Sequence, residues 1–220
     1  MINILLIIAE AIVSYLSLLL LSKKYKKDGI YIFAIIATFL SCILNLKQIS
    51  IMNVSVPIGF GITIAIIIGL NILIQQNGQE ETKNYLIIVL ITSIISYLFL
   101  NISELITDSE YNLLSNKSFD NIFSNNTRIY ISVTISLLLS LYLDSNLYYL
   151  IKKLQNKIIL SNIFSIIIVE FFENILFVLL AYLFEYEAID LILCIIFRYM
   201  IKTIIGLFGT IPLYIANKNK

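Results

Sequence analysis

The hydrophobic pattern of the chain is a series of seven apolar segments separated by polar connections. About 20 apolar residues in a helix span the roughly 30 Å hydrocarbon core of a bilayer. The segments cover approximately 2–22, 30–46, 57–75, 85–106, 128–150, 158–184 and 188–216. We therefore expect an all-α, polytopic membrane helix bundle with about seven transmembrane helices, a six-helix core plus an extra N-terminal helix, in one domain over residues 1–220.

The connections between these segments differ in charge. Lysines crowd the first connection, the fifth connection and the carboxyl terminus, at Lys23, Lys24, Lys26, Lys27, Lys152, Lys153, Lys157, Lys218 and Lys220. Because basic loops are retained in the cytoplasm, the odd-numbered connections and the C-terminus are predicted to be cytoplasmic. The N-terminus is then outside the cell (inner or plasma) membrane, as is the one long polar loop, 107–127.

The sixth segment carries two acids, Glu170 and Glu173, near its middle. An acid at the centre of a membrane helix costs roughly 3 kcal/mol, and each large apolar residue returns about 0.3–0.6 kcal/mol, so the segment still inserts. The seventh segment offers partners, because Arg198 and Lys202 are four residues apart on one helical face. Antiparallel packing would place Arg198 roughly level with Glu170. This predicts a buried charge cluster, either a functional site or a structural ion-pair cluster.

Neutral polar residues add to these charges. Asn71 and Gln75 share a face of the third segment, and Asn162 lies within an arc of about 80° with Glu170 and Glu173. Such amides bind ligands or simply hydrogen-bond a neighbouring helix. Asp144, near the inner end of the fifth segment, is expected to pair with the lysines that follow it. Glycine and proline could kink or end the seventh segment at Gly206, Gly209 and Pro212.

Composition excludes several classes of protein. The chain is 60% hydrophobic and 13% charged, whereas soluble domains have about 45–50% apolar and 25% charged residues. A net charge of +1 gives no basis for a nucleic-acid partner. There is no histidine, no metal-ligand spacing, no phosphate-binding loop and no nucleophile motif. We therefore expect no enzymatic activity, no catalytic residue, no metal and no cofactor.

Taken as a whole, the chain resembles the queuosine precursor transporters, a family of vitamin-uptake membrane proteins. The matching positions are Gly29, Tyr31, Ala37, Thr38, Lys47, Gly59, Gly78, Arg128, Asp144, Ser165, Lys202 and Thr210. Four polar positions depart from the family pattern: Asn71 and Gln75 stand at a usual Asp and Glu, and Glu170 and Glu173 at a usual Gln and Asp. Arg198 is an addition.

The resemblance implies uptake of a 7-deazaguanine base, such as queuine or a preQ0/preQ1-type base, for tRNA modification. The site would lie near the bilayer midplane between the third, sixth and seventh segments. A carboxylate there can accept the adjacent N–H donors of a guanine-like edge, and Lys202, Asn71 or Gln75 can donate to its carbonyl oxygen. Four aromatics near this depth could stack on the base, although plain lipid or core contact is the default interpretation: Phe171, Phe172, Phe177 and Phe197.

The expected substrate-binding residues are therefore Asn71, Gln75, Asn162, Glu170, Glu173, Arg198 and Lys202. Besides the small-molecule substrate, the expected partner is the lipid bilayer, and the chain could form a homo-oligomer. Two alternatives stay open: a multi-helix membrane sensor or binding module, and a substrate-binding subunit of an energy-coupled vitamin transporter. A sensor module would normally continue into an output domain, whereas this sequence stops soon after the last apolar segment.

Overall fold

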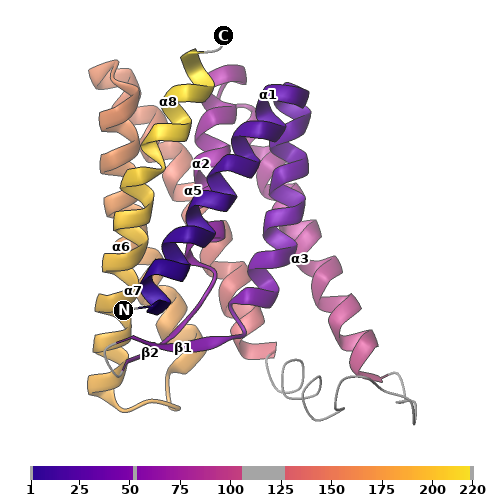
Figure 1. The fold of residues 1–220 in the computed structure, drawn as a ribbon, viewed down its shortest axis with the longest axis vertical. Helices are drawn as coiled ribbons and strands as arrows, with labels where there is room; N and C mark the ends of the chain where they lie inside the picture. The colour runs from indigo at the N-terminus through magenta and orange to yellow at the C-terminus, as the bar shows by residue number, and fades with distance from the viewer. Residues whose placement is uncertain (1, 52–53, 106–126, 219–220) are drawn as a thin grey trace.

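The computed structural model describes residues 2–51, 54–105 and 127–218. It is a bundle of helices with one small β-hairpin (Figure 1). Six helices are long and apolar enough to cross a membrane, which confirms the predicted all-α membrane bundle. The elements are α1 (Ile2–Leu44), β1 (Gln48–Ile51), β2 (Val54–Pro57), α2 (Phe60–Asn77), α3 (Glu81–Leu105), α5 (Thr127–Gln155), α6 (Ile158–Tyr182), α7 (Ala188–Phe208) and α8 (Thr210–Lys218).

Helix α1 contains the first two predicted segments. Its backbone leaves the helical conformation at Lys26, where φ is 51° and ψ is −128°. In Figure 1 the indigo half of α1 rises from the N-terminus and the violet half runs back down. Gly29 permits this reversal, because a Cβ there would overlap the carbonyl group of Leu21. The seven predicted segments thus form six long helices, of which the first is a helical hairpin.

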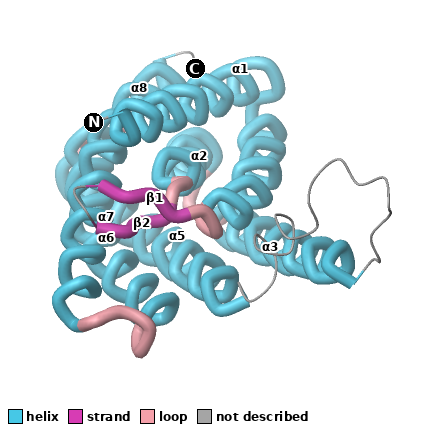
Figure 2. The backbone as a smooth tube through the Cα atoms, turned by 60° about the horizontal axis from the view of Figure 1, so that its bottom comes forward, coloured by secondary structure: helices cyan, strands magenta, loops and turns pink. Residues whose placement is uncertain are grey.

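Helix α2 is the centre of the bundle. Every residue from Phe60 to Ile74 is buried, and the other helices surround it in Figure 2. A helix that is apolar on all sides is stable only when it is enclosed, and α2 fits this rule. Any polar side chain on it, such as Asn71, must therefore find its partners inside the bundle.

The outer faces of the surrounding helices are apolar. Leu20 is 69% exposed, Phe99 is 65% exposed, and large aliphatic side chains of α3, α5 and α7 are exposed in the same way. A continuous apolar surface of this extent marks contact with a membrane or a partner. With six helices of membrane-spanning length, the surrounding medium is the hydrocarbon of the bilayer, and the protein is a multi-pass membrane protein.

The second connection forms a β-hairpin, which was not predicted from the sequence. Antiparallel strands β1 and β2 pair Gln48 with Pro57 and Ile51 with Val54. The hairpin lies across one end of the bundle (Figure 2). Because Pro57 ends β2, the following helix begins only at Phe60, after Gly59 takes the left-handed conformation with φ 94°. The third predicted segment therefore starts three residues too early.

The last predicted segment divides at Gly209 into α7 and α8, so the predicted interruption near the C-terminus is confirmed. Gly209 is also a point of close approach between elements. A Cβ at this position would lie 2.8 Å from side-chain atoms of Ile68 and from the hydroxyl of Tyr15. The Tyr15 hydroxyl donates to the carbonyl of Ile205 at 2.8 Å, which holds α1 against the end of α7.

The connections sort to the two ends of the bundle as the charge pattern requires. In Figure 1 the turn within α1, the α2–α3 and α5–α6 connections and the C-terminus lie at one end. The N-terminus, the β-hairpin and the α6–α7 connection lie at the other. The basic connections therefore share one end. Most of the long polar loop predicted at 107–127 lies outside the described residues.

Candidate functional site

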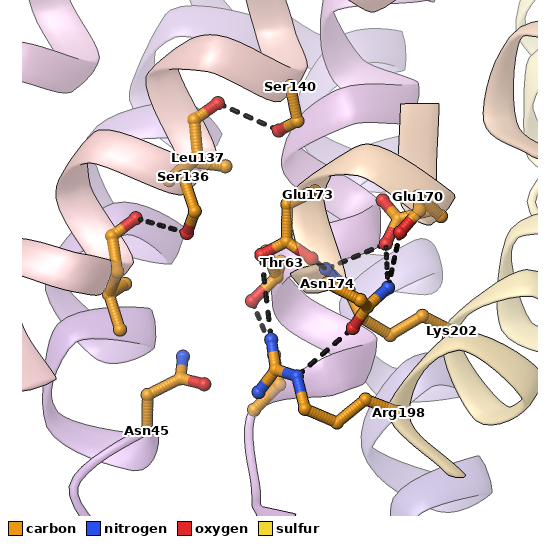
Figure 3. A network of polar contacts seen from close by, with 12 residues as sticks. Asn45, Thr63, Ser136, Leu137, Ser140, Glu170, Glu173, Asn174, Arg198 and Lys202 are labelled. Atoms are coloured by element: carbon orange, nitrogen blue, oxygen red, sulfur yellow. Dashed lines mark hydrogen bonds and ion pairs between the residues drawn. The ribbon is translucent and has the colours of Figure 1, made fainter. Parts of the chain in front are cut away.

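Four charged side chains meet between α6 and α7 (Figure 3). Lys202 Nζ lies 2.6 Å from Glu173 Oε2 and 2.7 Å from Glu170 Oε2. Arg198 Nη2 lies 3.5 Å from Glu173 Oε1. All four side chains are at most 3% exposed. The prediction that both bases face the sixth segment rather than lipid is confirmed, and we call these four residues the ion cluster.

The register of the ion cluster differs from the expected one. Arg198 was expected level with Glu170, but it contacts Glu173 and Asn174, and Lys202 is the base that reaches Glu170. The two helices are thus displaced by about one turn relative to the estimate from chain length alone. The register depends on the connection between Tyr182 and Ala188, whose path chain length alone does not fix.

Asn174 joins two residues of the ion cluster, although it was not among the binding residues expected from the sequence. Its amide nitrogen donates to the carbonyl oxygen of Glu170 at 2.6 Å, and its amide oxygen accepts from Arg198 Nε at 3.0 Å. It therefore bridges a backbone carbonyl of α6 and the guanidinium of α7. A signal was present in the sequence, because an amide four residues after Glu170 lies on the same helical face.

Two aromatic rings flank the guanidinium of Arg198. Its Cζ lies 3.8 Å from the ring centroid of Phe177 and 5.4 Å from that of Phe60, within the range of cation–π attraction. Phe177 was one of the four aromatics considered from the sequence, whereas Phe60, the first residue of α2, was missed. Phe171 and Phe172 are about half exposed on the outer surface, where contact with lipid accounts for them.

A small cavity adjoins the ion cluster. Its volume is about 10 Å³, which is room for about one water molecule, so this conformation is closed to a larger ligand. Two polar atoms of the cluster have no hydrogen-bond partner among the described residues, Arg198 Nη1 and Glu170 Oε1. Together they offer the two N–H groups of Nη1 as donors and one carboxylate oxygen as an acceptor. The cavity is lined by Asn45, Phe60, Thr63, Val133, Glu173, Phe177, Arg198 and Lys202.

Asn71 and Asn162 form a second polar group, apart from this cavity. Asn71 Nδ2 donates to Asn162 Oδ1 at 3.1 Å, and Asn162 Nδ2 donates to Thr210 Oγ1 at 3.3 Å. These bonds join α2, α6 and α8. We call Asn71, Asn162 and Thr210 the amide group.

Asp144 lies beside the amide group, near Asn71 and Ser165. The expected pairing of Asp144 with lysines is wrong: neither of its carboxylate oxygens has a hydrogen-bond partner among the described residues. The reason is position: Asp144 is fully buried inside the bundle, whereas Lys153 and Lys157 are exposed at the end of the bundle.

Gln75 is separate from both groups. Its side-chain oxygen accepts a hydrogen bond from the hydroxyl of Tyr148 at 3.3 Å, near the end of α2. The seven expected binding residues therefore occupy three places. Glu170, Glu173, Arg198 and Lys202 form the ion cluster, Asn71 and Asn162 form the amide group, and Gln75 contacts α5.

Comparison with known proteins identifies one family. Residues 57–216 match a family described as "Putative vitamin uptake transporter". The matched range runs from the end of β2 into α8 and includes the ion cluster, the amide group and Asp144. No curated protein and no solved structure matches the chain.

Proposed function

The chain belongs to this vitamin uptake transporter family, and on that premise we propose that it takes up a 7-deazaguanine base, such as queuine or a preQ0/preQ1-type base, for tRNA modification. The protein is a multi-pass membrane transporter for a small molecule and not an enzyme. The observation that carries the choice of substrate is the ion cluster, because the Glu173 carboxylate, the Arg198 guanidinium and the rings of Phe60 and Phe177 line one cavity.

These groups match the functional groups of a guanine-like base. Adjacent N–H donors on such an edge can be accepted in bidentate fashion by a carboxylate, here Glu173 with Glu170 beside it. The carbonyl oxygen of the base needs a donor, and Arg198 Nη1 has no other partner among the described residues. The ring plane would stack against Phe60 and Phe177, which already flank the guanidinium.

The proposed roles of the remaining expected residues follow from their positions. Lys202 contacts both acids of the ion cluster, and its positive charge favours the ionised carboxylates, which are the forms that accept N–H groups. Asn71, Asn162 and Gln75 do not line the cavity. In the proposed site Arg198 therefore takes the donor role for which the sequence offered Lys202, Asn71 or Gln75. Asn71 and Asn162 would contact the base only after the bundle opens between the cavity and the amide group.

The proposed orientation puts the basic end of the bundle in the cytoplasm of the cell. Single cysteines at Lys24 and Lys153 should be labelled by a membrane-impermeant maleimide only after permeabilisation, whereas a cysteine at Glu187 should be labelled in intact cells. The native Cys42 and Cys194 are buried and provide a low background. Labelling of Lys24→Cys and Lys153→Cys from opposite sides would overturn the topology.

The proposed substrate is tested by the queuosine content of tRNA. In a strain unable to make or import the precursor, expression of this protein at limiting external queuine or preQ1 should restore queuosine in tRNA. Excess guanine should compete only weakly if the 7-deazaguanine substituent contributes to binding. A matched control is Phe172→Leu, because Phe172 is about half exposed on the outer surface and its change should leave rescue intact. If no 7-deazaguanine restores queuosine, the proposed substrate is rejected, and the conclusion that the protein is a small-molecule transporter is unaffected.

A further inference from the structure

The charges buried inside the bundle do not balance. Among the described residues, the buried charged side chains are Asp144, Glu170, Glu173, Arg198 and Lys202. Three of these are acids and two are bases, so the interior carries one net negative charge when every group is ionised. An unpaired charge in a low-dielectric interior is strongly unfavourable. Ionisable residues inside a membrane protein mark by default a pathway or site for a substrate, an ion or a proton.

Asp144 is the acid that lacks a basic partner. Glu170 and Glu173 both contact Lys202 within 2.7 Å. Asp144, in contrast, is 0% exposed, and neither of its oxygens has a hydrogen-bond partner in the described part of the chain. The excess negative charge therefore belongs to Asp144.

The neighbours of Asp144 come from α2, α5 and α6. Asn71 of α2 and Ser165 of α6 lie beside it, and the ionisable groups that act on it are Glu170 of α6 and Tyr148 of α5. None of these supplies a positive charge. Within the described bundle, Asn71 Oδ1 also has no hydrogen-bond donor. A protonated carboxyl group is neutral and donates one hydrogen bond, so a proton on Asp144 would remove the excess charge and provide a donor for such an acceptor.

We propose that Asp144 is a proton-binding site, and that binding and release of this proton couple uptake to the proton gradient across the membrane. The proposal rests on the proposed function, because it names the energy source of the same transporter. The only bond made and broken is the O–H bond of Asp144, and the proton exchanges with water.

The position of Asp144 explains how protonation can be linked to movement. Helices α2, α6 and α8 are joined near it by the hydrogen bonds of the amide group. If these helices separate, Asp144 gains access to water, where its ionised form is solvated. When they close again, the carboxylate must regain a proton or remain buried as an unpaired charge. The closed and open states therefore differ in the number of protons that they bind, and pH shifts the equilibrium between them.

Thermal unfolding of the purified protein tests the proton site without any substrate. The wild-type protein should lose stability as the pH rises from about 4 to about 8, because the unfolded chain releases a proton over this range that the buried Asp144 retains. Asp144→Asn stays neutral and should lose less stability over the same range. Asp190→Asn, at an exposed acid of α7, should behave like the wild type. Equal pH dependence of Tm in the wild type and in Asp144→Asn would overturn the proposal.

Transport in proteoliposomes tests the coupling. With labelled queuine and an alkaline interior, the wild type should accumulate the base, up to about tenfold per pH unit for one proton. Asp144→Asn should lose this accumulation but keep gradient-free exchange of labelled for unlabelled base, and Asp190→Asn should keep both. Exchange without any response to the pH gradient, or accumulation driven by sodium instead, would overturn proton coupling. Absence of exchange for every base tested would reject the proposed substrate, and the unfolding experiment would still decide the proton site.

Discussion

Replacement of Glu173 by Gln should lower 7-deazaguanine uptake by about tenfold or more while protein level in the membrane holds. Gln is nearly isosteric with Glu but carries no charge. A hydrogen bond to a charged group contributes about 1.5–3 kcal/mol, and each 1.4 kcal/mol corresponds to about a factor of ten in binding. The level should hold because both bases keep another partner: Lys202 contacts Glu170 at 2.7 Å, and Arg198 Nε donates to Asn174.

The matched control for this change is Glu187→Gln. Glu187 is exposed and makes no side-chain cap with α7, so its neutralisation should alter neither uptake nor level. Initial uptake rates of labelled base, normalised to the protein in the membrane fraction, are the measurement. Wild-type uptake by Glu173→Gln would show that this carboxylate does not contact the substrate.

Replacement of Arg198 by Leu should sharply reduce the yield of folded protein. Arg198 contacts Glu173 and Asn174 and stacks on Phe177, so its loss leaves Glu170 and Glu173 with Lys202 as their one basic partner in the ion cluster. Removing one partner of a buried pair costs about 3–5 kcal/mol, a large part of the roughly 5–15 kcal/mol that stabilises a typical protein. Monodisperse protein recovered in mild detergent is the measurement.

A double-mutant cycle separates the charge effect of Arg198 from its packing. Because Glu173→Gln removes the acid that Arg198 neutralises, adding it to Arg198→Leu should restore part of the lost yield, as expected for two residues in contact. Phe172→Leu, on the outer surface, serves as the control for the loss of apolar contact. Wild-type yield for Arg198→Leu alone would mean that the ion cluster contributes nothing to folding.

The membrane segments and the ion cluster could be predicted because each rests on a strong local constraint. Hydrocarbon thickness fixes the length of an apolar helix, and the spacing of Arg198 and Lys202 fixes their shared face. The cost of leaving Glu170 and Glu173 unpaired then requires that these bases face them. The exact register could not be predicted, because it depends on where α6 ends and how the short connection to α7 turns.

Other features were missed for different physical reasons. The stretches QISI and VSVP alternate polar and apolar residues, which is typical of strands, and this signal for the β-hairpin lay within a connection treated as a loop. Asn71 and Gln75 share a face of α2, but α2 is surrounded by helices and meets a different neighbour at each level. Asn71 therefore contacts α6, whereas Gln75 contacts α5. Spacing along one helix cannot show which helix lies opposite.

Equilibrium binding of labelled queuine to the purified protein tests the central claim most directly. The claim is that the carboxylates of the ion cluster hold the transported base. The wild type should bind queuine saturably, and Glu170→Gln, Glu173→Gln should weaken binding by about tenfold or more, with Glu187→Gln binding as the wild type. Binding of queuine by the double variant with wild-type affinity would contradict the claim. The ion cluster would then be a structural element of the bundle, and the base would bind elsewhere.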